Sequence, residues 1–285
     1  MKINKILPQD SNYLSILKSI ADAPKSLNYI GKLPESRLPT VAIVGTRKPT
    51  RYGKEVTEQI AFELAKRGIV IVSGMALGVD GIAHRAALEA GGRTIAVLGS
   101  GLENIYPSTH RHLATDIVRG CGAIISEYPN TMPALGHQFL ERNRIVSGLA
   151  DAVIITEAAQ RSGTLNTAMH AMEQGKDVFV IPGPITSPMS LGCNNLLKQG
   201  AMPLLSSDDI LEVIAPQIRM MQSSLPLGNT PLEQAVVDFL QAGGRGGDEM
   251  QASIGATATE LSSALTMLEI AGTIRALGAN QWTLR

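Results

Sequence analysis

The stretch LERNRIVSGLADAVIITEAAQRSGTLNTAMHAMEQGKDVFVIPG, from Leu140 to Gly183, indicates the fold of this chain. The apolar run DAVIIT predicts a strand, a Gly-Thr turn and a helical pattern follow it, and VFVIPG predicts a second strand. Strand, turn, helix and strand in this order form a βαβ unit with a right-handed crossover. Strand ends and helix N-termini meet at one edge of such a unit, where backbone N–H groups bind anions. We therefore expect a phosphate-binding site in this stretch.

The same alternation of strand and helix extends on both sides of this unit. The runs VAIV, IVIVS and TIAVLG are apolar throughout, which is typical of strands in a mostly parallel sheet that is covered on both faces. Helices are expected at about 50–68, 80–89, 111–119 and 208–214, and a short edge strand at about 203–205. We predict an α/β fold, a doubly wound Rossmann-like domain over residues 40–214, with ligands at the carboxyl ends of its strands.

Three further segments flank this domain. Residues 1–39 are short and interrupted by prolines, and we interpret them as an adaptor packed on the main sheet, with a helix at about 13–20. Residues 215–230 contain Pro, Ser and Gly without periodicity, which is typical of a linker. Residues 231–285 show a helix, a Gly-rich turn, a helix from about Thr257 and a hairpin closed by Gly278-Ala279-Asn280. This order predicts a small winged-helix-like domain.

The composition limits the classes of function. The chain has 285 residues, 44% of them hydrophobic and 4% aromatic, with 25 Lys+Arg and 25 Asp+Glu. Because nucleic-acid binders usually carry a basic excess, any phosphate site in this neutral chain must depend on local positive charge. Cys121 and Cys193 lie far apart without metal-ligand spacing, and no apolar run has the length of a membrane span. We expect a cytoplasmic protein without a bound metal, a cofactor or a membrane anchor.

The strongest candidate site combines one aromatic residue with basic and small polar residues on both sides of a strand. Its members are Phe139, Arg142, Asn143, Arg144, Arg161, Ser162, Gly163 and Thr164. In an extended segment Arg142 and Arg144 share a face, whereas on a helix they point apart and one of them can form a core salt bridge. Phe139 would supply a flat apolar surface beside positive charge, as in proteins that bind single strands.

The turn after the first strand of the domain is the second candidate. It reads Gly45-Thr46-Arg47, which is not the GxGxxG fingerprint of dinucleotide-binding proteins. Four cations follow within eight residues at a helix N-terminus, namely Arg47, Lys48, Arg51 and Lys54. The helix dipole favours anions there, so an external anion would resolve the mismatch, and a solvated basic face is the alternative.

The next two turns are weaker candidates. Ser73 and Gly74 are small enough for a backbone to approach a ligand, while Asp80 either contributes to that turn or caps its helix. His84 on the same helix is more typical of a packed core residue than of a catalyst. In the third turn, after Ser100-Gly101, Tyr106 either stacks on a base or covers the sheet edge.

Catalytic constellations are scarce. The sequence has no paired carboxylates, no Ser/His/Asp spacing, no Walker lysine and no cluster with metal-ligand spacing. Glu127 and Glu157 lie near strand ends, where each is either a reactive carboxylate or a structural hydrogen-bond acceptor. We therefore expect a binding protein and no enzyme.

Several motifs resemble the DprA/Smf family, the DNA-processing proteins of natural transformation. They are GTR at 45–47, SGMALGVDGIAHRAAL at 73–88, TIAVLGSGLENIYP at 94–107, SEYP at 126–129, FLERNRIVSGLADAVIITEAAQRSGTLNTA at 139–168, VFVIPG at 178–183 and GCNNLLKQGA at 192–201. The resemblance covers about 40–214 almost without a gap, and the tail resembles the winged-helix module of many members.

This resemblance implies an extended Rossmann fold that binds single-stranded DNA, forms a homodimer, protects incoming DNA and promotes loading of a RecA-type recombinase in DNA recombination. By position, Arg47, Arg142 and Arg144 would hold backbone phosphates. Phe139 would contact a base, and Gly163 with Thr164 would present backbone donors. We expect the dimer contact near Leu204-Leu205 and the helix before it.

A related enzyme class competes with this interpretation. Nucleoside-monophosphate phosphoribohydrolases share a similar fold and carry a PGGxGTxxE signature whose glutamate is catalytic. The corresponding run here is QRSGTLNTA, and Thr167 occupies the position of the glutamate. Without that carboxylate the sequence disfavours hydrolysis. A module that senses a small nucleotide without turnover is the third alternative.

Overall fold

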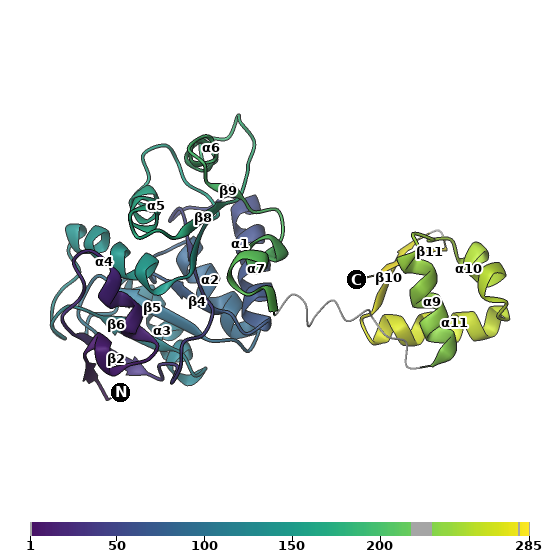
Figure 1. Cartoon of the computed structure of the whole chain (residues 1–285), viewed down its shortest axis with the longest axis horizontal. Helices are drawn as coiled ribbons and strands as arrows, with labels where there is room; N and C mark the ends of the chain where they lie inside the picture. Colours follow the sequence, from purple (N-terminus) through teal and green to yellow (C-terminus); the bar gives the residue numbers. More distant parts are fainter. Residues whose placement is uncertain (1, 218–229, 279, 285) are drawn as a thin grey trace. The chain divides into compact units, whose positions relative to one another are not determined.

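The computed structural model describes residues 2–217, 230–278 and 280–284. It divides the chain into two compact units, Met1–Ile218 and Arg219–Arg285, drawn in Figure 1. Most of the predicted linker at 215–230 lies outside the described residues, as does Ala279 of the predicted hairpin turn.

A nine-stranded sheet forms the centre of the large unit, in the order β1-β2-β6-β5-β4-β3-β7-β8-β9. From β6 to β9 all neighbours are parallel, whereas β1 and β2 are antiparallel to their neighbours. The predicted mostly parallel sheet is therefore confirmed. The strands are β1 (Asn4–Ile6), β2 (Leu27–Gly31), β3 (Thr40–Val44), β4 (Val70–Ser73), β5 (Thr94–Leu98), β6 (Ala123–Ser126), β7 (Ala152–Ile155), β8 (Asp177–Val180) and β9 (Met202–Pro203).

Helices cover both faces of this sheet (Figure 1). Because side chains alternate along a strand, Val41 and Ile43 of β3 pack toward one layer, and Ala42 and Val44 pack toward the other. One layer contains α1 (Arg51–Lys66), α2 (Val79–Glu89), α3 (Arg111–Arg119) and α7 (Ser207–Ile214). The other contains α4 (Gly136–Leu149), α5 (Thr164–Glu173), α6 (Leu191–Lys198) and the 3-10 helix η2 (Leu14–Ser19); the short 3-10 helices η1 (Pro8–Asp10) and η3 (Ser108–His110) lie in connections.

The first 39 residues belong to the large unit itself. They add β1 and β2 to the edge of the sheet beside β6, and Tyr13 and Leu17 of this segment are fully buried in the core. The Tyr13 hydroxyl forms a hydrogen bond with Thr40 Oγ1 at 3.1 Å, and burial raises the pKa of Tyr13 to about 12. The predicted adaptor is therefore an integral part of the sheet, and the predicted helix at 13–20 is the 3-10 helix η2.

The segment that contains Arg142-Asn143-Arg144 is helical. It lies within α4, which follows directly on the Pro- and Gly-rich loop that ends near Gly136. Its apolar face consists of Ile145, Val146 and Leu149, which pack on the sheet. Buried arginines occupy positions that pattern rules assign to apolar residues, which conceals the helical period of α4 in the sequence.

The small unit is a winged helix. It contains α9 (Pro231–Gln241), α10 (Gly247–Ile254), α11 (Ala258–Ile270) and the hairpin β10 (Ile274–Gly278) and β11 (Gln281–Leu284). Thr257 caps α11 through a capping box with Glu260, and Val236, Leu265 and Leu268 contribute to a separate core. The sequence analysis missed α10, because the glycines before it are typical of a turn.

The order of the strands reverses between β3 and β7. The chain proceeds outward from β3 through β4 and β5 to β6, and then returns to β7, which pairs in parallel with β3. In open parallel sheets ligands bind in the crevice outside the carboxyl ends of the strands at such a reversal. The topology therefore points to the turns after Val44 and Ile155.

Candidate functional site

A pocket of about 600 Å³ lies at this reversal. Three elements contribute its walls: the turn after β3, the exposed side of α4, and the loop that leads into α5. The residues that line it are Val44, Gly45, Thr46, Arg47, Lys48, Ala76, Asp80, Phe139, Leu140, Arg142, Asn143, Ala159, Arg161, Ser162, Gly163, Thr164, Thr167 and Met189. The topology thus joins two candidate motifs that lie about a hundred residues apart in the sequence.

Arg47 and Phe139 form the centre of the pocket rim. The guanidinium carbon of Arg47 lies 5.5 Å from the centroid of the Phe139 ring, within the range of a cation–π contact. The ring of Tyr106, which is half exposed, lies 5.5 Å from that of Phe139 at an interplanar angle of 40°. A positive charge and two accessible rings therefore share one short stretch of surface.

Backbone hydrogen bonds on both sides hold the turn that carries Arg47. The Thr46 N–H donates to Glu157 O at 2.8 Å, and the Val79 N–H donates to Thr46 O at 3.2 Å. The carboxylate of Glu157 accepts from Thr50 N at 2.8 Å and from Thr50 Oγ1 at 2.6 Å. Glu157 is therefore a structural acceptor at the start of α1, as one of the two alternatives predicted.

Only two of the four clustered cations line the pocket. Arg47 and Lys48 are exposed on its wall. Arg51 lies on α1, where its Nε donates to Glu55 at 2.7 Å, and Lys54 lines a separate small groove between α1 and α2. The basic cluster is therefore split between the pocket and a solvated helix face.

The start of α5 supplies the opposite wall. Gly163 is the N-cap residue and has no side chain to cap the helix, while Ser162 Oγ accepts from Thr164 N at 3.2 Å. Arg161, directly before this turn, is exposed and lines the same pocket. The positive end of the helix dipole and a cation therefore face the space beside Arg47.

Arg142 lies in the floor of the pocket and is only 5% exposed. Its Nη1 donates to Gly74 O at 2.6 Å and also to Val97 O, so the guanidinium joins α4 to the carboxyl ends of β4 and β5. Burial lowers the pKa of Arg142 to about 10, and the charge of Asp80 opposes this shift. Arg142 therefore remains a cation at neutral pH.

Asp80 is the carboxylate nearest to this guanidinium. Its Oδ2 accepts from Gly74 N at 3.1 Å and from Ala76 N at 3.2 Å, so it closes the second turn upon itself. Burial raises the pKa of Asp80, whereas Arg142 and the two backbone donors lower it. Asp80 is the single acidic residue among the described residues that line the pocket.

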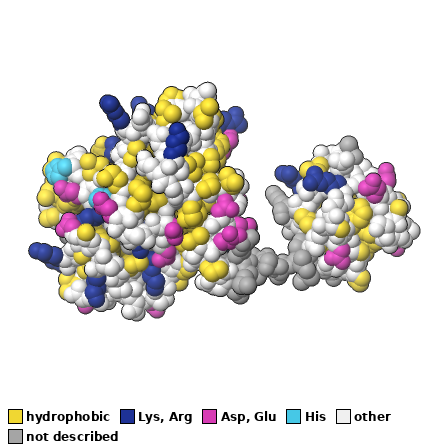
Figure 2. Space-filling model, turned by 45° about the horizontal axis from the view of Figure 1, so that its top comes forward, with side chains coloured by type: hydrophobic (Ala, Val, Ile, Leu, Met, Phe, Trp, Pro, Cys, Tyr) yellow, Lys and Arg dark blue, Asp and Glu magenta, His cyan; other side chains and the backbone are white. Residues whose placement is uncertain are grey.

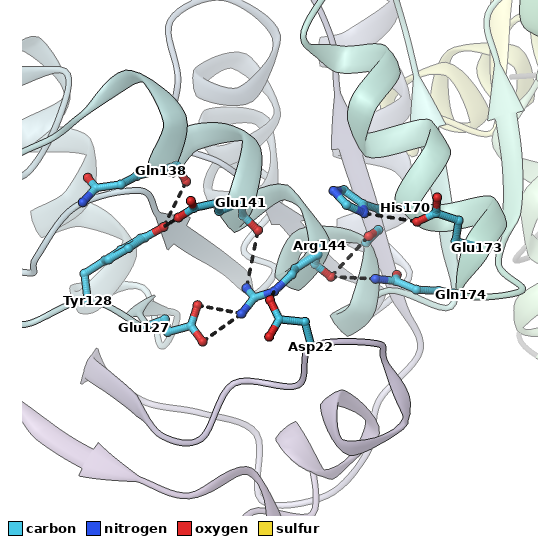
Figure 3. A network of polar contacts seen from close by, with 10 residues as sticks. Asp22, Glu127, Tyr128, Gln138, Glu141, Arg144, His170, Glu173 and Gln174 are labelled. Atoms are coloured by element: carbon cyan, nitrogen blue, oxygen red, sulfur yellow. Dashed lines mark hydrogen bonds and ion pairs between the residues drawn. The ribbon is translucent and has the colours of Figure 1, made fainter.

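Arg144 lies on the other side of α4, which corrects its predicted place at the phosphate site. Its guanidinium donates to both carboxylate oxygens of Glu127 at 2.8 Å and to Asp22 at 3.2 Å, as Figure 3 shows. Burial lowers the pKa of Arg144, but hydrogen bonds and charge from Glu127 and Asp22 outweigh it and raise the pKa above its usual value. Residues two apart on a helix point about 200° apart, so the helix separates the two arginines.

Ser73, Gly74 and Ser100 lie at the same sheet edge, but none of them lines the pocket, which differs from the predicted ligand contacts of Ser73 and Gly74. Ser73 Oγ donates to Ile43 O at 2.6 Å, and Ser100 Oγ donates to Asn104 O at 2.7 Å. A Cβ at Gly74 would lie 2.5 Å from Arg142 Nη2 and 2.7 Å from Asp80 Oδ2. Position 74 therefore has no room for a side chain, because two buried charged groups lie directly beside it.

His84 is a buried core residue. Its Nδ1 forms a hydrogen bond with Thr94 Oγ1 at 2.6 Å, and its Nε2 is buried without a partner among the described residues. Burial, with smaller contributions from His110, Arg142 and Arg85, lowers the pKa of His84 to about 3. A neutral imidazole locked to Thr94 fits the packed role that the sequence favoured.

The pocket combines exposed cations with aromatic surface, an arrangement that can hold an anion. The described part of the chain contains no group of three His, Cys, Asp or Glu side chains that could hold a metal ion. None of the described helices is long and apolar enough to cross a membrane. On the face drawn in Figure 2, acidic and basic side chains of the large unit are interspersed, and no broad basic band crosses that face.

Sequence reasoning missed two contributions to this site. The sequence predicts that Asp80 contributes to the turn or caps its helix. Its position six residues after Gly74 does not indicate that it lies near a buried arginine. Leu140 and Met189 add apolar surface to the pocket wall. Met189 lies in the connection before α6, where no local pattern marks it.

Comparison with known proteins places this architecture in a family. The family described as DNA recombination-mediator protein A matches residues 4–215, and the DprA winged helix domain matches residues 222–280. Protein Smf of Escherichia coli is 44% identical over 73% of this chain and 56% of its own length. DNA processing protein DprA of Bacillus subtilis is 41% identical over 74% of this chain and 71% of its own length.

Two solved structures of relatives superpose on the large part of the chain. DprA from Streptococcus pneumoniae gives a TM-score of 0.69 at 40% identity and covers 75% of each chain. DprA from Helicobacter pylori, described for its single-stranded DNA binding mode, gives a TM-score of 0.65 at 34% identity over 78% of this chain and 97% of its own. The chain thus spans little more than half of Escherichia coli Smf and most of several other relatives. It belongs to the DprA/Smf family of DNA-processing proteins.

Proposed function

We propose that this chain binds single-stranded DNA in the pocket at the β3–β7 reversal. The observation that carries this proposal is the Arg47–Phe139 pair beside the start of α5. Arg47, Lys48 and Arg161 would neutralise backbone phosphates, and the N–H groups around Gly163 would donate to one of them. Phe139 and Tyr106 offer ring faces on which a base can stack.

The arrangement favours single strands over duplexes. Stacking on Phe139 requires an unpaired base, and the three exposed cations surround a pocket of about 600 Å³, not a broad groove. Contacts to phosphate and to ring faces carry little sequence information. We therefore expect similar affinities for oligonucleotides of different sequence and a preference for unpaired strands. The Helicobacter pylori relative, whose structure is described for its single-stranded DNA binding, supports this class of ligand.

Fluorescence anisotropy of labelled oligonucleotides at several salt concentrations tests this function. Log affinity should fall linearly with log salt, with a slope of about −0.7 per phosphate neutralised on a single strand. Duplexes of the same sequence should compete weakly. A flat response to salt, or tighter binding of the duplex than of the single strand, contradicts the proposal.

We further propose that DNA binding serves recombination: the chain protects incoming single strands and promotes loading of a RecA-type recombinase during natural transformation. The description of the matching family as a recombination mediator supports this role. A strand-exchange assay with strands precoated by single-strand binding protein tests it. The full chain should restore recombinase filament growth, and equal filament growth without the chain argues against mediation.

A homodimer is the assembly that we propose for this function. Leu205, directly after edge strand β9, is 80% exposed, whereas its neighbour Leu204 is buried. Ile185, in the loop before α6, is 85% exposed. Sedimentation of Leu205→Glu should show monomers where the parent forms dimers. Leu7→Glu, which alters an exposed leucine in the connection between β1 and η1, serves as the matched control and should remain dimeric.

The competing phosphoribohydrolase function lacks a suitable carboxylate. Thr167 lines the pocket where such enzymes carry a glutamate, and it is 1% exposed. Asp80 is engaged by the backbone of its own turn. An assay for ribose 5-phosphate release from nucleoside monophosphates should therefore show no activity, and release above background would revive the enzyme alternative.

A further inference from the structure

The buried charges beneath the pocket are engaged with the protein itself. Arg142 donates to two carbonyl groups at the ends of β4 and β5, and Asp80 accepts from two N–H groups of the turn after β4. The two side chains lie on either side of Gly74, where a Cβ would meet both. These contacts engage Nη1 of Arg142 and Oδ2 of Asp80, so both side chains hold backbone groups of the protein itself.

The turn that these charges hold contacts the turn of Arg47. Gly78 has a φ of +76°, and a Cβ on it would lie 2.5 Å from Thr46 O and 2.6 Å from the carbonyl carbon of Arg47. The next residue, Val79, donates its N–H to Thr46 O. The backbone that carries Arg47 is therefore packed directly against the turn closed by Asp80.

The aromatic partner of Arg47 is linked to the same charges from the other side. Phe139 and Arg142 are three residues apart on α4, so they lie on one face of that helix. The bonds from Arg142 to Gly74 and Val97 fix this face of α4 against the strand ends. The relative placement of Arg47 and Phe139 thus depends on a continuous series of contacts through Gly74, Asp80 and Arg142.

We propose that Asp80 and Arg142 are positioning residues for nucleic-acid binding, which set the geometry of the Arg47–Phe139 pair and do not themselves hold a phosphate. This inference rests on the proposed function of the pocket. It assigns to Arg142 a role different from that of a phosphate contact. It also explains why an acidic residue, Asp80, lies beside a proposed anion site: its carboxylate holds the turn after β4.

Neutralising Asp80 tests whether this residue positions the turn or only repels the bound strand. The two explanations predict opposite changes in affinity for single strands. If Asp80 were only a negative charge beside the bound strand, Asp80→Asn would remove repulsion and tighten binding. If it positions the turn, the same change weakens binding by roughly tenfold, because the neutral amide oxygen is a weaker acceptor for the two backbone N–H groups than a carboxylate oxygen and leaves Arg142 without its counter-charge. Unchanged or tighter binding by Asp80→Asn overturns the proposal.

Arg142→Lys separates position from charge. The lysine keeps the positive charge but cannot reach both carbonyl groups in the same geometry. We expect weaker binding with an unchanged dependence on salt, since no phosphate contact is lost. A drop of about 0.7 in the magnitude of the salt slope would mark Arg142 as a direct phosphate ligand and would overturn its positioning role.

Two glycine variants keep the test falsifiable if the charge variants fold poorly. Gly78 and Gly68 both have positive φ values, +76° and +81°, and Gly78 in addition has a ψ of −127°, outside the left-handed helical region. A Cβ at Gly68 has no atom within 4 Å, whereas at Gly78 it meets the Arg47 turn. Gly78→Ala should displace the Arg47 turn and weaken binding severalfold per folded molecule, and Gly68→Ala should not. Equal affinities of the two variants contradict the proposal.

All variants are compared in the full chain, with the active fraction measured by stoichiometric titration. Arg47→Glu is included to separate the two levels of inference. If Arg47→Glu binds single strands normally, the proposed site itself is wrong. If Arg47→Glu loses binding while Asp80→Asn gains it, the site stands and only the positioning role fails.

Discussion

The two units of this protein both have folds that often bind nucleic acid, but only one of them presents the necessary charge. The pocket of the large unit has Arg47, Lys48 and Arg161 around exposed rings. The winged-helix unit places α11 where such domains carry a recognition helix, and its sequence ATELSSALTMLEI contains neither lysine nor arginine.

The charge balance extends this contrast to the whole winged-helix segment. Residues 230–285 contain the basic residues Arg245, Arg275 and Arg285, against the acidic residues Glu233, Asp238, Asp248, Glu249, Glu260 and Glu269. Because contacts to phosphate dominate affinity for nucleic acid, an acidic unit of this kind should contribute little to it. Fold therefore sets where a ligand can bind, and side-chain charge sets which ligand it is.

Among the variants proposed here, charge reversal at Arg47 should cause the largest loss of affinity for single strands. Arg47→Glu replaces a phosphate contact by repulsion and should weaken single-strand binding by about 100-fold, or about 2.7 kcal/mol. The measurement is an anisotropy titration at fixed salt. Arg51→Glu is the matched control, since Arg51 lies four residues further along, outside the pocket, and is exposed beside Glu55. Equal losses in both variants would mean that only overall charge matters.

Arg144 tests whether the two faces of α4 differ in role. Arg144→Gln removes the ion pairs to Glu127 and Asp22 and should lower the free energy of unfolding by about 2 kcal/mol, as expected for lost hydrogen bonds between charged groups. Affinity for single strands should remain within about twofold of the parent, because no pocket contact is lost. Urea unfolding and anisotropy measure the two quantities. A large loss of affinity at unchanged stability would return Arg144 to the binding surface.

His84 should make the large unit sensitive to acid in a way that the winged-helix unit, which has no histidine, is not. Its pKa is lowered to about 3, so the folded state binds fewer protons than the unfolded state between that value and the ordinary pKa of about 6.5. Stability contributed by neutral His84 is present above pH 6.5 and is lost as the pH falls, by about 2 kcal/mol at pH 5. Unfolding of the parent and of His84→Asn between pH 5 and 8 measures this. Parallel pH profiles would contradict the buried, neutral state of His84.

The smallest effect is expected from the winged-helix unit. Reversal of Arg275 to glutamate should change single-strand affinity by less than about twofold, because acidic residues outnumber basic ones in residues 230–285. Arg161→Glu, an exposed arginine in the pocket wall, is the comparison and should weaken binding clearly. If Arg275→Glu weakens binding as much as Arg161→Glu, the winged helix takes part in DNA binding and the contrast between the units is lost.

Local sequence pattern predicts the parallel sheet of the large unit, which the structure confirms, and the sheet edge at which the candidate site lies. Apolar runs such as VAIV and AVII can only be strands buried on both faces, and glycine-containing turns after them mark the carboxyl edge. The presence of Thr167 at the position of the catalytic glutamate likewise follows from the sequence alone. These conclusions depend on local pattern and on residue type, both of which can be read from the sequence.

The assembled sheet and helices determine which charged residues line the pocket. Arg142 and Arg144 are equivalent in the sequence, but α4 directs one toward Gly74 and Val97 and the other toward Glu127. The partners come from strands and loops 17 to 68 residues away, so no local pattern reveals them. The role of Asp80 likewise depends on packing of its turn against the backbone of Arg47. Long-range contacts that satisfy buried charges are set by the assembled sheet, and they determine which residues remain free to bind.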